Sequence, residues 1–569
     1  MAKTNAKVTP LTLHDEGALA MRNRILKLDA SDNVLIALTD LNQREQIAFS
    51  GNNYTLVSDI PAKHKFATED LAIGADVIMY GVIVGRAVKP VLQGERLTTS
   101  NIQHQAASFH QQSQGYRWAP PDVSRWKQQT FLGYRRSDGQ VGTRNYWLVV
   151  PLVFCENRNI IVLKQAFEEE LGFAPPQVYR HQVSELATLY REGRTEELKA
   201  GLLPANGGDP RPARVFKNID GIKFLVHQGG CGGTREDSNN LCGLIAGYIN
   251  HPNVAGVTVL SLGCQHAQVG ILRQQLRKRA PNFDKPLFIL EQQQSGTEFA
   301  MLSEAIQRTF LGLVEANQAE RTPAAISHLC VGLKCGGSDG FSGLSANPAI
   351  GHTADLLIAL GGRTILSEFP ELCGVEQELI NRSARSEISD RFVELMRDYQ
   401  ARAKSVGSGF EMNPSPGNIR DGLITDAMKS AGAAKKGGTS PVTAVLDYPE
   451  YSTEPGLNLQ CTPGNDVECV TAQVGAGASV VLFTTGLGTP TGNPITPVVK
   501  LSTNSELAER MSDIIDIDTG GVISGEKTIE QTGEAILDYV IRVANGDVRT
   551  KAELKGQEDF IPWKRGVSL

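Results

Sequence analysis

The chain has 569 residues, of which 41% are apolar and 21% charged, and its formal net charge at pH 7 is −6. This length predicts two to four domains, with ample apolar material for their cores. A slightly acidic chain without a basic cluster offers no electrostatic footprint for nucleic acid or for an anionic membrane surface.

Targeting signals and disulfides are not indicated. The first residues hold no apolar signal core, and no stretch of about 18 apolar residues follows, so we expect no membrane span and a cytoplasmic protein. Nine cysteines over this length suit a reducing compartment, where thiols serve packing, metal binding or catalysis. The sequence leaves the oligomeric state open, a homo-oligomer included.

The first compact stretch, residues 24–100, has short apolar runs separated by turns, which predicts a small β domain. One of its loops, in the string IPAKHKFATEDL, carries His64 and Lys65. A Gln- and Ser-rich segment without periodicity follows over residues 101–130 and is expected to be a linker.

From residue 131 the pattern changes to near-continuous Val, Ile and Leu runs that are bounded by glycine loops and separated by helical stretches. Strands of this kind are buried on both faces, so we expect mainly parallel sheets covered by helices. A polar stretch divides the region into a first α/β lobe, residues 131–320, and a second, residues 321–569. Residues 173–221 would make an unusually long connection and are expected to be a surface insertion. Helices are expected at 157–171, 235–250, 296–317, 350–360, 374–403 and 526–545.

Three loops place a cysteine among small residues directly after an expected strand, in the strings HQGGCGGTRED, SLGCQH and LKCGGSDG. Open α/β sheets bind ligands at the carboxyl ends of their strands, so Cys231, Cys264 and Cys335 could converge there. Converging thiolates, with His227 or His266 nearby, favour iron, zinc or an iron–sulfur cluster. Because no loop has the CxxC spacing of a strong metal motif, buried inert thiols are the alternative.

The most informative loop is CVGLKCGGSDGFSGLSANP, residues 330–348, whose glycines allow a close backbone approach to a ligand. Its hydroxyls, carboxylate and amide indicate a polar ligand site, with a plain connecting turn as the alternative. The string LSEFPELCGVEQ adds Glu368 and Glu371, which suit a metal ligand, a general base or a general acid. The string FEMNPSPGN exposes Asn413 and Asn418 on a stiffened loop, where a solvated turn is equally plausible.

Several strings occur in one order along the chain: IPAKHKFATEDL, GYRRSDGQVGTRNYW, LSLGCQHAQV, GLKCGGSDGFSGLSANPAIG, NPSPGN, PGNDVECVT and TTGLGTPTGNPITPVVKLSTNSELA. Together they resemble the altronate and galactarate dehydratases, which remove water from hexonic or hexaric acids. The resemblance spans most of the chain. It implies an N-terminal domain of the SAF type and a lyase that uses a divalent metal, Fe²⁺ or Mn²⁺, to make a 2-keto-3-deoxy sugar acid.

Departures from the family pattern bear on the substrate. The segment 173–221 is longer than expected for the family, and the sequence around Cys231 differs from the usual family pattern. The KSLGC-like string of altronate dehydratases reads KSAGA here, so that thiol is not essential in this chain. The string PGNDVE and the closing strings are more similar to altronate dehydratases than to galactarate dehydratases. We therefore expect altronate as the substrate, with galactarate or another hexarate or hexonate as alternatives. The alternatives are a sulfolactate sulfo-lyase, which the fusion of the domains disfavours, an iron–sulfur enzyme and a non-catalytic sugar-acid-binding protein.

The implied reaction removes a weakly acidic proton next to a carboxylate, so it needs charge stabilisation, a base and an acid. We expect Cys231, Cys264 and Cys335 at or near the metal. Proton transfer is expected from Glu368 or Glu371 and from His64 or Lys65. Arg144 is included for substrate binding because its planar fork suits a carboxylate, although a surface ion pair is the alternative. The expected substrate-binding residues are Arg144, Ser338, Asp339, Asn347, Asn413 and Asn418.

Overall fold

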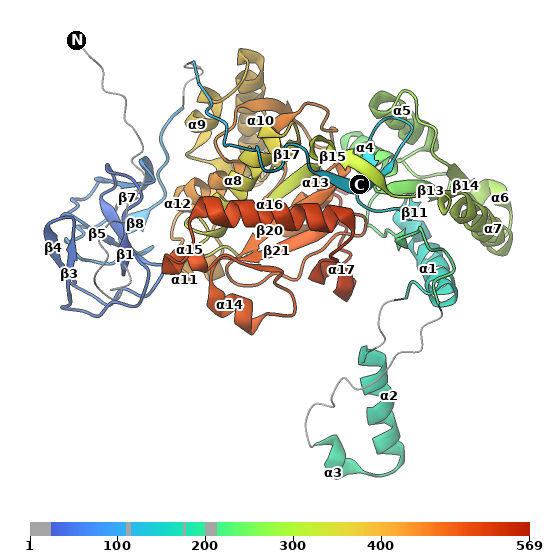
Figure 1. Ribbon diagram of the computed structural model, residues 1–569, viewed down its shortest axis with the longest axis horizontal. Coiled ribbons are helices and arrows are strands. Elements are labelled where there is room, and N and C mark those ends of the chain that lie inside the picture. Colours follow the sequence, from blue (N-terminus) through green and yellow to red (C-terminus); the bar gives the residue numbers. More distant parts are fainter. Residues whose placement is uncertain (1–23, 110–114, 175–177, 200–212, 569) are drawn as a thin grey trace.

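The computed structural model describes residues 24–109, 115–174, 178–199 and 213–568. Three units lie in a row: the N-terminal β domain, then the second α/β lobe, then the first α/β lobe at the far end (Figure 1). The predicted fold class, a small β-rich domain followed by a two-lobed α/β region with mainly parallel sheets, is confirmed. No helix among these described residues has the length and apolar character needed to cross a membrane.

The N-terminal β domain consists of short antiparallel strands around a core that includes Leu35 and Phe66. A second apolar cluster begins in this domain at Val34 and Ile36 and continues into the second lobe, so the domain is packed onto that lobe. Its strands are β1 (Ile25–Leu26), β2 (Val34–Ala37), β3 (Gln46–Phe49), β4 (Asn52–Thr55), β5 (Lys65–Ala67), β6 (Asp76–Met79), β7 (Val82–Ala87) and β8 (Ile102–Gln103).

The segment expected to be a linker, residues 101–130, begins with β8 of the N-terminal domain, and its later part lies against the second lobe. The Trp126 side chain is 2% exposed, and its Nε1 donates to Asp538 at 2.8 Å. Tyr116 donates its hydroxyl proton to the carbonyl of Thr439. The chain then enters the first lobe through β9 (Thr130–Arg135) and leaves it through β15 (Thr322–Ala325), and these two strands pair antiparallel beside β10 (Val141–Gly142).

The first lobe is built on a parallel sheet of order β12-β11-β13-β14 with helices around it. Its strands are β11 (Tyr146–Pro151), β12 (Gly221–Phe224), β13 (Val254–Ser261) and β14 (Leu287–Glu291). The main helices are α1 (Asn157–Leu171), α4 (Arg235–Asn250), α5 (Val269–Arg279), α6 (Gln292–Ser295) and α7 (Glu298–Ala316). The expected insertion holds α2 (Val178–Arg191) and α3 (Thr195–Leu198), which project from the lobe as a separate arm (Figure 1), and most of its LPANGGDPRPARV string lies outside the described residues.

The second lobe is built on a seven-stranded parallel sheet of order β18-β19-β17-β16-β20-β21-β22. Its strands are β16 (Cys330–Cys335), β17 (Arg363–Leu366), β18 (Val442–Leu446), β19 (Gly456–Gln460), β20 (Val480–Thr485), β21 (Val498–Ser502) and β22 (Ile517–Asp518). Its helices are α8 (Ala346–Ala359), α9 (Glu376–Asn381), α10 (Ser386–Ser405), α11 (Pro416–Arg420), α12 (Asp426–Ala433), α13 (Asp466–Gly475), α14 (Ser505–Arg510), α15 (Gly521–Ser524), α16 (Ile529–Asn545) and α17 (Lys551–Lys555).

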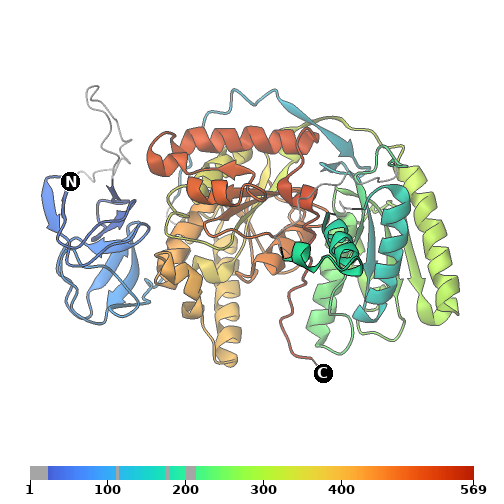
Figure 2. The ribbon, with the colours of Figure 1, turned by 90° about the horizontal axis from the view of Figure 1, so that it is seen from below.

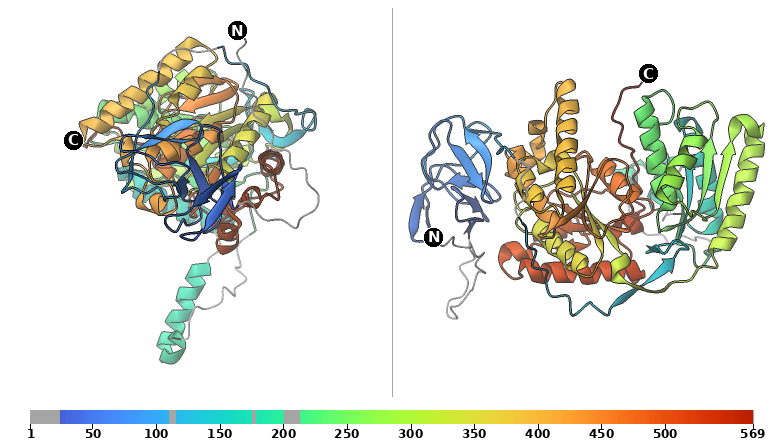
Figure 3. Two further views of the ribbon diagram at one scale, coloured as in Figure 1. Left: turned by 90° about the vertical axis from the view of Figure 1, so that its left-hand side faces the viewer. Right: turned by 90° about the horizontal axis from the view of Figure 1, so that it is seen from above.

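The C-terminal tail after α17 returns between the two lobes (Figures 2 and 3). Ser568 forms an isolated bridge with Gly233 of the first lobe, while Arg565 pairs with Asp447 of the second. The tail therefore connects the two lobes at a cleft that lies between them.

Candidate functional site

The carboxyl end of β16 lies where the strand order of the seven-stranded sheet changes direction. From β16 the chain adds β17, β18 and β19 on one side, then crosses to add β20, β21 and β22 on the other. Such a switch point leaves a crevice outside the strand ends, and ligands of open α/β sheets bind there. Cys335 is the last residue of β16, so the loop after it occupies the expected ligand position.

The glycine loop after Cys335 runs close to α13. A Cβ atom at Gly336 would come within 2.3 Å of the Asp466 carboxylate, so a larger residue would have to displace that side chain. The loop is fastened to β20 because Gly336 donates its N–H to the carbonyl of Thr484. This packing explains the paired glycines and holds Cys335 in the interior.

A buried cluster of two glutamates and three lysines surrounds Cys335. Lys334 and Lys436 both pair with Glu368, and Lys429 pairs with Glu371 at 2.8 Å. Lys436 Nζ also lies 2.8 Å from Cys335 Sγ. Since the opposite charges compensate each other, the cluster can exist inside the lobe.

The cluster strongly perturbs its ionisable groups. Burial opposes the ionisation of Glu371, but Lys429, Lys334 and Lys436 outweigh it and lower the pKa of this carboxyl to about 2. Burial raises the pKa of the Cys335 thiol to about 12, against the ammonium of Lys436. Without substrate, Glu371 is therefore a carboxylate and Cys335 a neutral thiol. Perturbed groups of this kind gather at functional sites.

Glu368 has a strained backbone. Its φ of 69° and ψ of 55° lie in the left-handed region, which residues other than glycine rarely adopt. The conformation is held by its own N–H, which donates to the Thr462 hydroxyl at 3.0 Å. Such strain is concentrated at sites where side-chain placement matters more than local stability, and here it aims the carboxylate at the two lysines.

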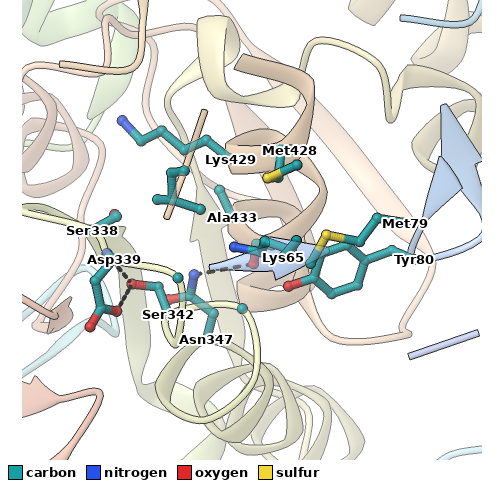
Figure 4. A pocket seen from close by; sticks show the side chains of 14 residues that line it. Lys65, Met79, Tyr80, Ser338, Asp339, Ser342, Asn347, Met428, Lys429 and Ala433 are labelled. Carbon is teal, nitrogen blue, oxygen red and sulfur yellow. Dashed lines mark hydrogen bonds between the residues drawn. The ribbon is translucent and has the colours of Figure 1, made fainter. Parts of the chain in front are cut away.

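The N-terminal β domain closes over this region beside an enclosed cavity of about 10 Å³, room for one water (Figure 4). Lys65 reaches the cavity from β5 and donates to the Gly422 carbonyl at 2.7 Å. Burial lowers the pKa of Lys65 to about 7, so its amine and ammonium forms are both populated near neutral pH. Lys429 also lines the cavity, which connects Lys65 to the buried cluster.

Two more residues of the same loop connect the N-terminal domain to the second lobe. Lys63 pairs with Asp339 and with Asp421, each at 3.0 Å. His64 Nε2 lies 3.0 Å from the Arg420 carbonyl, which can only accept, so Nε2 carries the proton. Its Nδ1 is then a bare acceptor, and it is buried without a hydrogen-bond partner.

The predicted substrate-binding residues of the second lobe lie near one another, but they differ in whether their polar atoms already have hydrogen-bond partners. Asp339 already binds Lys63 and Thr503, Asn347 bridges Thr484 and the Gly432 carbonyl, and Asn418 donates to the Ser338 carbonyl. The Ser338 hydroxyl, in contrast, is buried without a partner at the cavity. Asn413 contacts both Lys429 and Glu371, so it belongs to the cluster itself.

Three predicted site residues lie elsewhere. Cys231 and Cys264 follow β12 and β13 in the first lobe and are exposed, whereas Cys335 is buried in the second lobe with its own partners. Arg144 is buried in a bidentate pair with Glu553, at 2.8 and 3.1 Å, and also donates to two carbonyls. Four hydrogen bonds hold its guanidinium within the fold. Arg144 is therefore in an ion pair, as the alternative interpretation had it, but the pair is buried and not on the surface.

The resemblance implied a divalent metal, and two groups of described residues have three ligand atoms within 4.8 Å of one another. The Cys335, Glu368 and Glu371 group does not fit a cation, because three ammonium groups already occupy its acidic atoms. The other group, His104, Cys373 and Asp426, fits better. Both Asp426 oxygens are buried without a hydrogen-bond partner, and nitrogen, sulfur and oxygen donors together suit zinc or ferrous iron.

Sequence reasoning missed the lysines of the cluster. Lys334 had a readable signal, since a lone lysine within the apolar strand CVGLKC must find a buried partner. Lys429 and Lys436 had no such signal, because they stand in a stretch of polar and small residues whose sequence does not indicate burial. His104 lay in the segment expected to be a linker.

Family models match each of the three structural units of the chain. Residues 326–568 match the family model described as D-galactarate/Altronate dehydratase, C-terminal. Residues 133–317 match the one described as D-galactarate dehydratase/Altronate hydrolase, second domain, and residues 23–105 match the Altronate/galactarate dehydratase SAF domain. The three matched regions correspond to the two lobes and the N-terminal domain.

Curated relatives cover nearly the whole chain. The altronate dehydratase of Escherichia coli (strain K12) is 33% identical over 96% of this chain and 99% of its own length. The altronate dehydratase of Bacillus subtilis (strain 168) is 32% identical with the same coverage, and the galactarate dehydratase (L-threo-forming) of Escherichia coli (strain K12) is 30% identical over 93% of this chain and 94% of its own. The chain belongs to the altronate/galactarate dehydratase family and is a hydro-lyase.

Proposed function

We propose that this chain dehydrates a hexonic sugar acid, altronate before others, to a 2-keto-3-deoxy sugar acid. The observation that carries the proposal is the buried cluster at the carboxyl end of β16, where three lysines meet Cys335, Glu368 and Glu371. Altronate is favoured over galactarate by the string PGNDVE and by the slightly higher identity to the two altronate dehydratases.

The reaction generates negative charge on the substrate, and this chain supplies positive charge where it is needed. Loss of the C2 proton places charge on the neighbouring carboxylate, which the ammonium groups of Lys429 and Lys436 stabilise. Glu371, which is ionised before the reaction, accepts the C2 proton. Lys65, with a pKa of about 7, protonates the departing 3-hydroxyl, which leaves as water, and the resulting enol tautomerises to the ketone.

A divalent ion would be held by His104, Cys373 and Asp426, next to Glu371, and it would supply Lewis-acid polarisation of a substrate oxygen. Asp426 favours this assignment because both of its carboxylate oxygens are buried without a hydrogen-bond partner. Fe²⁺ and Mn²⁺ are the ions to test first.

The N-terminal domain acts as a lid in this proposal. A cavity of about 10 Å³ cannot contain a six-carbon acid, so the described arrangement is a closed one. Lys63, His64 and Lys65 are the side chains that attach the lid to the second lobe. Lids of this kind exclude water during the chemical step and must open to release product.

A substrate panel tests the proposal. The purified chain is incubated without oxygen with altronate, galactarate, other hexonates and sulfolactate, each with Fe²⁺ or Mn²⁺, and 2-keto-3-deoxy acid and sulfite are assayed. We expect the keto-acid from altronate at the highest rate, and none from the Glu371→Gln variant. Sulfite from sulfolactate, with no keto-acid from any sugar acid, would replace the proposal by a sulfo-lyase. No product in any arm would exclude the dehydratase function.

A further inference from the structure

Three free thiols of the first lobe lie at one edge of its sheet. Cys155 follows β11, Cys231 follows β12 and Cys264 follows β13. These strands are adjacent and parallel in the order β12-β11-β13, so their carboxyl ends meet. The sequence had grouped Cys231 and Cys264 with Cys335, but the third thiol on this sheet edge is Cys155.

The loops that carry these thiols are hydrogen-bonded to one another. Phe154, next to Cys155, donates its N–H to the carbonyl of Gly229 at 3.1 Å, and Ala267 donates to that of Gly230 at 3.0 Å. The Cys231 loop is thus held between the other two. Gly230 has a φ of 97°, and a Cβ there would lie 2.1 Å from the Leu152 carbonyl, so the close approach requires glycine.

The thiols are near enough to influence one another. Desolvation, followed by the charges of Cys231 and then Cys264, raises the pKa of Cys155. Thiols that lie close together are unfavourable once they ionise, because their negative charges repel one another. Such a cluster is typical of a site whose thiolates are neutralised by a metal.

The spacing favours a cluster over a single ion. Three thiolates on one ion would lie about 4 Å apart, given metal–sulfur bonds of about 2.3 Å. Among the described residues, Cys155, Cys231 and Cys264 are not among the groups whose ligand atoms all lie within 4.8 Å of one another. An iron–sulfur cluster binds each thiolate to a different iron and therefore accepts wider spacing.

The site opens toward substrate-sized space. Cys231 lines the cleft between the lobes, which has a volume of about 860 Å³ and is also lined by Glu468 of α13 and by Phe560 and Trp563 of the C-terminal tail. Asp466, at the start of the same helix, pairs with Lys334 of the buried cluster at 3.0 Å. A ligand in this cleft would therefore lie between the thiols and α13.

We propose that Cys155, Cys231 and Cys264 bind a [4Fe–4S] cluster whose fourth iron has no protein ligand and faces the cleft between the lobes. The open iron takes oxygen ligands, such as the carboxylate and hydroxyl of a sugar acid that enters this cleft, a position separate from the cavity beside Lys65. This role for the open iron rests on the proposed function, whereas the binding of the cluster does not.

Reconstitution tests the cluster directly. The full chain is treated without oxygen with Fe²⁺ and sulfide, desalted, and assayed for iron, acid-labile sulfide and visible charge-transfer absorption. We expect about four irons and four sulfides per chain. The Cys155→Ser, Cys231→Ser and Cys264→Ser variants should each lose the absorption while unfolding at the wild-type temperature, because these thiols are exposed. The Cys335→Ser and Cys242→Ser variants are the matched controls and should retain it.

The open iron has its own test. Ferricyanide should take one electron from [4Fe–4S]²⁺ to leave [3Fe–4S]⁺ and one free Fe²⁺, seen as a new paramagnetic signal and as about one iron lost per chain. A cluster that keeps four irons would refute the open position. A wild type that binds no sulfide, or a cluster lost in Cys335→Ser but kept in Cys155→Ser, would overturn the inference. A loaded but inactive chain would overturn only the proposed function.

Discussion

Lys436 Nζ lies 2.8 Å from Cys335 Sγ, and both side chains are at most 2% exposed. Because burial raises the pKa of the thiol to about 12, the ammonium donates to a neutral thiol and not to a thiolate. A metal ion at Cys335 would therefore have to displace the Lys436 ammonium that already contacts the sulfur. The position of Cys335 aligns Lys436 between the thiol and Glu368.

Replacing Lys436 should lower kcat strongly and the stability of the fold moderately. In Lys436→Met, the substrate carboxylate loses an ammonium partner, so we expect kcat to fall about 10²- to 10⁴-fold. Stability should fall by about 3 kcal/mol because Glu368 loses one of its two buried partners. Product formation and thermal unfolding measure the two effects.

Two further variants separate chemistry from folding. Lys435→Met is the matched control, because this neighbouring lysine is only partly buried and lies 3.8 Å from Glu378, and its kcat should stay near the wild-type value. The double variant Lys436→Met with Glu368→Gln removes both charges and should regain stability without activity. If it regained activity, the role of Lys436 would be structural alone.

The sequence predicted the fold well where local pattern and tertiary environment agree. The ranges expected for the helices at 157–171 and 235–250 are those of α1 and α4, and the apolar runs became buried parallel strands. β19 was missed because Gly456, Asn458 and Gln460 do not read as an apolar strand. Their burial depends on tertiary hydrogen bonds, such as that from Gln460 to the Ala472 carbonyl, which no local pattern encodes.

The candidate site was predictable only in part, because it is assembled from distant segments. Glycine loops identified Cys335 and the strand end, and the pair Glu368 and Glu371 followed from their loop. The thiols were grouped because each stands in a similar loop after an expected strand, but Cys231 follows β12 of one sheet and Cys335 ends β16 of another. Lys436 reaches Cys335 across 101 residues, a relationship that only the folded chain provides.

Lys65 should make stability depend on pH. Its pKa is about 7 in the folded chain and about 10.5 when unfolded, so between these values the unfolded state binds more protons and stability rises with pH. Below pH 7 the buried charge costs on the order of 5 kcal/mol. Lys65→Met removes this cost, so the variant should be more stable than the wild type near pH 6, and the gap should shrink toward pH 10.

Thermal unfolding of both proteins across this range measures the gap. The variant also loses the bond to the Gly422 carbonyl, but that loss is the same at every pH. A gap of constant size would mean that Lys65 keeps an ordinary pKa and does not serve as the proton donor proposed above.

Lys63 should hold the N-terminal domain in its closed position. Its ammonium joins the fully buried Asp339 to Asp421, and Lys63→Ala leaves Asp339 without its charged partner. We expect faster amide hydrogen exchange, by about tenfold or more, in residues 336–345 and 60–67, together with a lower kcat/KM. Lys89→Ala, at an exposed position of the same domain, is the control and should change neither. Unchanged exchange in Lys63→Ala would show that the apolar contacts alone keep the lid closed.

A divalent ion should bind at His104, Cys373 and Asp426 and should be detectable without turnover. Co²⁺ is the probe, since a cobalt–thiolate bond absorbs in the near ultraviolet. Cys373→Ser should lose this band, while His104→Ala and Asp426→Asn should weaken binding at least tenfold. Binding should strengthen as pH rises, because the imidazole and the thiol must release their protons to bind the ion.

The band must persist in Cys231→Ser, which separates this site from the exposed thiols of the first lobe. If the band vanished in Cys231→Ser and survived in Cys373→Ser, the ion would belong to the first lobe, and the buried Asp426 would be a protonated acid, consistent with the burial that raises its pKa.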